Sequence, residues 1–174
     1  LRAVPRPEDG SSRAVISILL MSKSKYAEAT GAEAIGGSPP DDMFQDDTFA
    51  PVRELRHDDV LSTDEFTLRA VHTPGHVGNH FCFFLEEEGV MFAGDHIMNG
   101  STVVIIPPSG DMKAYIESLQ RLLDYPLRAI APGHGDLMGD PRAVVEWLVE
   151  HRLQREHAAA DAALQPCGPA ALRP

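Results

Sequence analysis

The sequence predicts an α/β domain, and three observations lead to that fold class. Short apolar runs, alternating or continuous as in strands, recur along residues 66–131. Two segments in the same half space their apolar residues at i, i+3 and i+4, as amphipathic helices do. Strands and helices follow one another in turn, which is the order of an α/β fold.

The composition supports one globular domain. The chain has 174 residues, of which 43% are hydrophobic and 24% charged, enough for a sizeable core. Fifteen Lys and Arg against 26 Asp and Glu give a net charge of −11 with His neutral. This charge argues against partners such as nucleic acids or anionic membranes, because both require a basic surface. We therefore expect a cytoplasmic protein whose partner is a small-molecule substrate.

Other features of the composition narrow the class further. The two cysteines, Cys82 and Cys167, are too few for a disulfide framework or a four-thiolate zinc site. The longest apolar run, residues 14–21, is too short for a membrane helix. The chain starts at Leu1 and its first methionine is Met21, so we expect it to be processed, started at an unusual codon or part of a longer protein.

The N-terminal part of the chain, residues 1–44, is a segment without a clear hydrophobic period. Within it we expect a short helix over residues 25–32. A loop rich in glycine, proline and aspartate is expected from residue 36 to residue 51, beyond the end of this segment. The patterned region covers residues 45–158, and residues 159–174 form a disordered tail.

The patterned region opens with predicted strands. Residues 66–72 alternate apolar and polar side chains, and residues 80–85 and 90–93 form a hairpin around a glycine-containing turn. Residues 103–106 are expected to form a short fourth strand, ended by two prolines. A further apolar strand follows at residues 128–131.

Two helices complete the prediction. Asp111 begins the first, whose apolar face comprises Met112, Tyr115, Ile116, Leu119, Leu122 and Leu123. Asp140, followed by a proline, is the N-cap of the second. We expect one face of this helix to carry Val144, Trp147, Leu148 and His151. It is expected to fray over residues 158–163.

Three predicted strands end in the same way. His76, Asp95 and His134 each follow a glycine at a strand's carboxyl end. Glycine permits tight turns and close backbone approach there, and imidazole and carboxylate groups suit zinc or iron. One such turn is ordinary structure, whereas three in one sheet predict a shared metal site.

The residues around these turns resemble motifs of a known family. Residues 72–76 read His-Thr-Pro-Gly-His, residues 92–95 read Phe-Ala-Gly-Asp, and residues 131–135 read Ala-Pro-Gly-His-Gly. Together they resemble the later metal-binding motifs of the metallo-β-lactamase superfamily, in its branch of glyoxalase II-like proteins and β-lactamase-like endoribonucleases. The resemblance implies an incomplete αββα sandwich, mainly its C-terminal half.

The resemblance also implies a hydrolytic reaction. His76 would bind one metal ion, His134 a second, and Asp95 would bridge the two. A hydroxide between the metals would attack a thioester, an ester or a phosphodiester. Zinc is the expected metal, and iron is compatible with the same ligands.

The chain departs from the family at its first motif, His-x-His-x-Asp-His, which supplies four further ligands. Upstream of His76 the sequence has only His57 and His72, and neither has that spacing. We therefore expect at most one weakly held metal ion and an impaired hydrolase. Two alternatives stay open: a non-catalytic truncated remnant, and a half-domain completed by a partner chain. Strands exposed by the missing half would allow self-association.

Other reactive side chains have simpler interpretations. We expect His80 to pack near the site and Cys82 to be a core thiol, since nothing nearby lowers its pKa. His96 should point to the opposite side of the chain from its neighbour. Arg152 and Arg155 are expected to lie on an ordinary solvated helix face.

Overall fold

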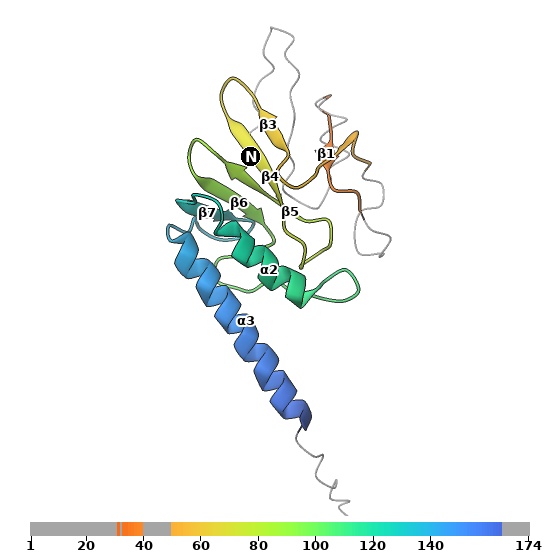
Figure 1. Cartoon of the computed structure of the whole chain (residues 1–174), viewed down its shortest axis with the longest axis vertical. Coiled ribbons are helices and arrows are strands. Elements are labelled where there is room, and N and C mark those ends of the chain that lie inside the picture. The colour runs from red at the N-terminus through yellow and green to blue at the C-terminus, as the bar shows by residue number, and fades with distance from the viewer. Residues whose placement is uncertain (1–30, 32, 40–49, 165–174) are drawn as a thin grey trace, which may run out of the picture.

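A computed structural model of the chain describes residue 31, residues 33–39 and residues 50–164 (Figure 1). Within these residues the strands are β1 (Ile35–Gly36), β2 (Arg53–Glu54), β3 (Val60–Ser62), β4 (Thr67–His72), β5 (Phe81–Leu85), β6 (Val90–Gly94) and β7 (Ala129–Pro132). The helices are α2 (Met112–Leu122) and α3 (Pro141–Leu164). The alternation of strands and helices confirms the α/β class.

Five strands form one sheet in the spatial order β3-β4-β5-β6-β7. The strands β3 to β6 pair antiparallel with their neighbours, whereas β7 lies parallel to β6. Consequently β4, β6 and β7 run in the same direction, and their carboxyl ends lie at one edge of the sheet. The strands β1 and β2 form a separate parallel pair.

Both faces of the five-stranded sheet are apolar, because successive residues of each strand point to opposite sides. The face covered by α2 and α3 (Figure 1) carries the larger core, which includes Val71, Cys82, Phe84, Met91, Ala93, Tyr115, Leu119, Leu122, Ile130, Val145 and Leu148. The opposite face carries a smaller cluster of Leu55, Leu68, Ala70 and Phe83. Burial on both faces explains why several strands read as continuous apolar runs.

The structure confirms the strands predicted around residues 66–72, 80–85, 90–93 and 128–131. The expected hairpin is present, since β5 and β6 are antiparallel neighbours. The strand expected at residues 103–106 is wrong: this segment has no ladder partner and is a loop. Three short strands, β1, β2 and β3, were not predicted, because two or three residues are too few to show a period.

The first predicted helix is confirmed as α2. Its N-cap, Asp111, accepts a hydrogen bond from the amide of Ala114 at 2.8 Å, which satisfies one of the free amides of the first turn. Tyr115, Leu119 and Leu122 are fully buried on the expected face.

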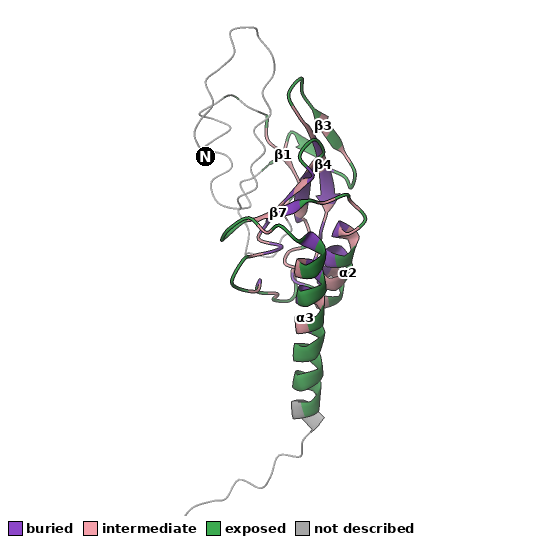
Figure 2. Cartoon of the chain, turned by 90° about the vertical axis from the view of Figure 1, so that its left-hand side faces the viewer, coloured by how far each residue is buried: buried purple, intermediate pink, exposed green. Residues whose placement is uncertain are grey.

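The second predicted helix is confirmed as α3, but its buried face is rotated from the expected one. The core residues are Val145 and Leu148, and Arg152 is buried beside them, whereas Trp147 is 55% exposed. The expected solvated position of Arg152 is therefore wrong. The expected fraying is also wrong, because the helix continues to Leu164. Much of the second half of this helix is exposed (Figure 2). Neither described helix is long and apolar enough to cross a membrane.

Several predictions fall wholly or partly outside the described residues. These are most of the helix at 25–32, the middle of the loop at 36–51, and the tail beyond residue 164. At the start of that loop, Ile35 and Gly36 pair with Arg53 and Glu54, so the loop begins one residue later than predicted.

Candidate metal centre

The parallel ends of β6 and β7 bring two of the three predicted ligands together. Asp95 directly follows β6, and His134 lies two residues beyond the end of β7. The Nε2 atom of His134 is 3.5 Å from Oδ1 of Asp95. The Asp95 side chain is 30% exposed and that of His134 is 67% exposed, so both can meet an ion or substrate from solvent.

This pairing depends on the glycine before His134. The amide of Gly133 donates to the carbonyl of Gly94 at 2.7 Å. A Cβ atom at position 133 would lie 2.7 Å from the carbonyl carbon and oxygen of Gly94 and 2.8 Å from Oδ1 of Asp95. Any larger residue would therefore separate the two strand ends or displace the carboxylate.

Asn99 fixes the loop that carries His134. Its amide donates to the carbonyl of His134 at 3.0 Å, and its Nδ2 donates to the carbonyl of Asp136 at 3.0 Å. Gly135 has a positive φ of 94°, and a Cβ there would lie 2.7 Å from Cβ of Asn99. Asn99 was not predicted as a residue of the site, because an asparagine in a loop gives no periodic signal.

The third predicted ligand, His76, lies in the loop between β4 and β5, and this loop packs closely against α2. Gly75 has a φ of 140°, and a Cβ there would lie 2.3 Å from Cα of Tyr115. The amide of Asp111 donates to the carbonyl of Gly75 at 2.8 Å, and Ser118 Oγ donates to the carbonyl of Pro74 at 2.7 Å. The helix α2 and its N-cap therefore hold the loop that presents His76.

His76 reaches the same edge of the sheet but does not join the pair. The strand β5 lies between β4 and β6, so the axes of these two strands are about 10 Å apart. The described residues contain no group of three or more His, Cys, Asp or Glu side chains that could hold a metal ion. Imidazole and carboxylate groups fit zinc or iron. Only two of them, Asp95 and His134, lie together here, and two ligands do not make a complete metal site.

Two neighbouring histidines belong to the core. The ring of His96 is fully buried, 4.8 Å from the Tyr115 ring and 5.5 Å from that of His80. Burial lowers the pKa of His96 well below its ordinary value, and the nearby His80 and His76 lower it further. His80 is buried with Nδ1 2.8 Å from Oγ1 of Thr73, which supports the predicted packing role.

Cys82 is a core thiol, as predicted. It is completely buried, and its Sγ lies 3.3 Å from Oγ1 of Thr73. Burial raises the pKa of this thiol to about 12, and the hydrogen bond to Thr73 lowers it by a smaller amount. The thiolate needed for nucleophilic attack is therefore almost absent at neutral pH.

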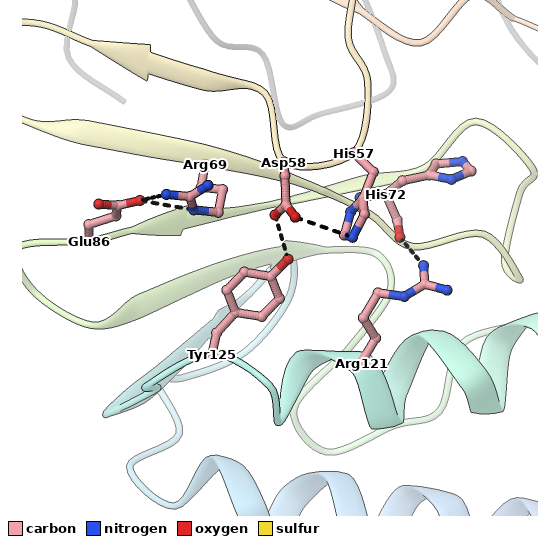
Figure 3. Close-up of polar contacts among 7 residues, drawn as sticks. All are labelled: His57, Asp58, Arg69, His72, Glu86, Arg121 and Tyr125. Atoms are coloured by element: carbon pink, nitrogen blue, oxygen red, sulfur yellow. Dashed lines mark hydrogen bonds and ion pairs between the residues drawn. The ribbon is translucent and has the colours of Figure 1, made fainter.

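Polar contacts at the other end of α2 connect the helix to the sheet (Figure 3). Tyr125 donates to Oδ1 of Asp58 at 2.8 Å, and Nη1 of Arg121 donates to the carbonyl of His72 at 2.8 Å. His57, the other upstream histidine, lies 3.7 Å from Asp58 through its Nε2. Both upstream histidines therefore take part in structural contacts around β4.

Comparison with known proteins decides the family. A model of the metallo-beta-lactamase superfamily matches residues 16–134, which is more than half of the chain. The chain belongs to the metallo-beta-lactamase superfamily. The superfamily match includes His76, Asp95 and His134 and extends upstream into residues that the structure does not describe.

Curated relatives cover most of the chain but less of their own length. A beta-lactamase-like protein 2 homolog from Drosophila melanogaster is 34% identical over 117 residues, 67% of this chain and 38% of that protein. An atrochrysone carboxyl ACP thioesterase from Aspergillus fumigatus is 30% identical over 131 residues, 75% of this chain and 38% of that protein. The chain thus spans well under half the length of these superfamily members.

Solved structures confirm the superfamily fold, and the chain covers only part of each of them. A metallo-beta-lactamase family protein from Thermus thermophilus has a TM-score of 0.58 and 33% identity, covering 63% of this chain and 38% of that one. The protein TTHA1623, solved in a di-iron-bound form, has a TM-score of 0.53 and 26% identity, covering 74% of this chain and 67% of that one.

Proposed function

We propose that the chain contributes the C-terminal part of a metal-dependent hydrolase whose substrate is a small-molecule thioester. The approach of His134 to Asp95 at 3.5 Å carries this proposal, because a part-exposed imidazole–carboxylate pair at a sheet edge is suited to hold a divalent metal ion. The name of the Aspergillus fumigatus relative favours thioesters over the other ester classes. A cytoplasmic location remains a prediction.

The chain's own residues would hold the metal from the end of each parallel strand. Asp95 and His134, which already lie together, would be its ligands, and His76 would contribute from the end of β4. Zinc or iron, when bound, would make a water molecule acidic enough to act as a nucleophile at neutral pH. Gly133 and Asn99 hold the pair in position through the contacts described above.

We further propose that the chain needs a second contributor for full activity. The 174-residue sequence contains no His-x-His-x-Asp-His motif, and the described residues hold no three-ligand cluster. A partner chain that carries this motif would complete the site. Self-association could cover exposed apolar side chains such as Val104, Ile106 and Leu137, but a second copy would not supply the missing motif.

Metal binding by the purified chain tests the proposed site directly. We expect isothermal titration with Zn²⁺ or Fe²⁺ to show one weak site per chain and no second site. Asp95→Asn and His134→Ala should each lower the metal affinity at least about tenfold. Substitution of residues that only support a metal ligand commonly lowers the affinity by that factor. Asp136→Asn and His157→Ala are matched controls, since both residues are exposed and neither is a proposed ligand. No binding by the unmodified chain, or equal losses in the controls, would contradict the site.

Thioester hydrolysis tests the reaction class. Acyl thioesters of N-acetylcysteamine release a free thiol that Ellman's reagent detects. We expect slow turnover that a chelator abolishes, and faster turnover after a fragment bearing His-x-His-x-Asp-His is added. Absence of turnover with and without that fragment, in a chain that binds metal, would favour the non-catalytic remnant. Faster hydrolysis of an oxygen ester or a phosphodiester would overturn the thioester assignment.

A further inference from the structure

Arg152 is an unusual residue for the interior of this fold. It lies on α3 and is only 7% exposed, with its guanidinium carbon 5.4 Å from the centre of the Tyr115 ring. Its Nη2 donates to the carbonyl of Val103. Burying a guanidinium costs free energy unless it is hydrogen-bonded, so this position calls for a specific role.

The segment that Arg152 contacts is the one that binds His76. Residues 103–106 form no strand, so no sheet ladder holds their backbone in place. The Val103 side chain is buried, and the next carbonyl, that of Val104, lies 2.6 Å from Nδ1 of His76. Because the two peptide groups are consecutive, a contact that fixes the Val103 carbonyl also restricts the Val104 carbonyl.

The contact with Val104 determines which nitrogen of His76 carries the proton. A carbonyl oxygen can only accept a hydrogen bond, so Nδ1 must donate. The neutral ring then keeps its lone pair on Nε2, the nitrogen available to a metal ion or to a proton.

We propose that Arg152 is a positioning residue that holds His76 in its Nδ1–H tautomer through the backbone of Val103 and Val104. This inference rests on the proposed function in one respect, the binding of metal by Nε2 of His76. The tautomer itself does not require metal. Arg152 acts from α3, a helix that contributes none of the proposed ligands.

Tyr115, on α2, stabilises the same arrangement. Its hydroxyl donates to the carbonyl of His96 at 3.0 Å, and its backbone packs against Gly75. One residue therefore contacts the loops that carry His76 and Asp95, while its ring faces Arg152. Burial raises the pKa of Tyr115 to about 12, so it remains a hydrogen-bond donor at neutral pH.

Nitrogen-15 NMR of the metal-free chain, labelled at histidine and arginine, tests the inference without any substitution in the measured sample. His76→Gln assigns the His76 signals by their disappearance. We expect a protonated Nδ1 and an unprotonated Nε2 on His76. We also expect slowly exchanging guanidinium protons on Arg152 and fast exchange on the exposed Arg155. An Nε2–H tautomer at His76, or fast exchange at Arg152, would overturn the proposal.

Substitution of Arg152 then tests the connection between the two residues. Arg152→Met retains the length of the side chain but removes its donors, and we expect loss of the pure Nδ1–H signal of His76. Arg152→Lys should restore part of it, and Arg155→Met should leave it unchanged. A folded Arg152→Met chain with the original tautomer would refute the role. If Arg152→Met does not fold, Arg152→Lys is compared with the wild-type spectra, and an unaltered tautomer with fast exchange of the lysine amine refutes it.

These results are separable from those of the proposed function. Loss of metal binding in Asp95→Asn concerns the strand-end pair, whereas the tautomer of His76 is read in the absence of metal. A chain that binds no metal but shows the Nδ1–H tautomer would contradict the metal site and leave the positioning role intact. A chain that binds metal but lacks the Nδ1–H tautomer would refute the positioning role and leave the metal site intact.

Discussion

The backbone of Gly133 lies directly against that of Gly94, with the amide of the first donating to the carbonyl of the second at 2.7 Å. This contact closes the parallel ends of β6 and β7 just before Asp95 and His134. The geometry of the candidate metal centre therefore depends on two residues that have no side chain, and substitutions there give the clearest tests.

Gly133→Ala should destabilise the chain and disrupt the pair. The added methyl group would lie 2.7 Å from the carbonyl of Gly94 and 2.8 Å from the Asp95 carboxylate, so we expect a loss of about 1–3 kcal/mol in the free energy of unfolding. Urea denaturation measures it. Gly139→Ala is the control, because nothing lies within 4 Å of a Cβ there, and its effect should stay within about 0.5 kcal/mol. Equal effects would show that the close approach is not needed.

Gly75→Ala should be at least as harmful as Gly133→Ala. Its φ of 140° disfavours any side chain, and the new Cβ would lie 2.3 Å from the backbone of Tyr115 on α2. We expect a loss of roughly 2 kcal/mol or more, from overpacking and backbone strain together. Thermal denaturation followed by circular dichroism checks it, with Gly78→Ala as the control because its Cβ would meet open space. A chain with unchanged melting would contradict the close packing of the loop after β4 against α2.

Cys82 should resist thiol reagents in the native chain. Its pKa is raised to about 12 and it is fully buried, so at pH 8 both the thiolate and access to it are lacking. In a Cys167→Ser background, Ellman's reagent should react only as fast as the chain unfolds. The raised pKa means that the unfolded chain releases this proton first as pH rises above about 9. Stability should therefore fall from there towards pH 12, and rapid labelling at pH 8 would contradict the buried position.

Tyr125 should titrate above the ordinary pKa of a phenol. Partial burial raises the pKa of Tyr125, and the hydrogen bond to Asp58 and the charge of that carboxylate raise it further. The stabilising contact is present below pH 10, the ordinary phenol value, and is lost as pH rises beyond it. Difference ultraviolet spectroscopy of the wild type and Tyr125→Phe reads the titration directly.

The same variant, Tyr125→Phe, should cost about 0.5–1.5 kcal/mol at pH 7 for the lost hydrogen bond. Asp58→Asn provides the other half of a double-mutant cycle, which isolates the coupling between the two side chains. A phenol that titrates normally, together with zero coupling, would show that the contact in Figure 3 does not form in solution.

The sequence alone was sufficient to predict the longer strands and helices and to indicate the family. Strands β4 to β7 and helix α2 were predictable because each has a clear apolar period or run between turn residues. The strand-end glycines and the motifs at residues 72–76, 92–95 and 131–135 indicated the superfamily. The choice of His76, Asp95 and His134 as metal ligands is still a prediction, and the titrations proposed above test it.

The tertiary structure decided what local pattern could not. Residues 103–106 have the composition of a strand but no neighbour to pair with, so their carbonyls bind Arg152 and His76 instead. The face of α3 that turns inwards depends on how the helix packs on the sheet, which exposes Trp147 and buries Arg152. The parallel pairing of β6 with β7 brings Asp95 to His134, while the intervening β5 keeps His76 apart. Such facts concern residues far apart along the chain, and a periodic pattern carries no information about distances of that kind.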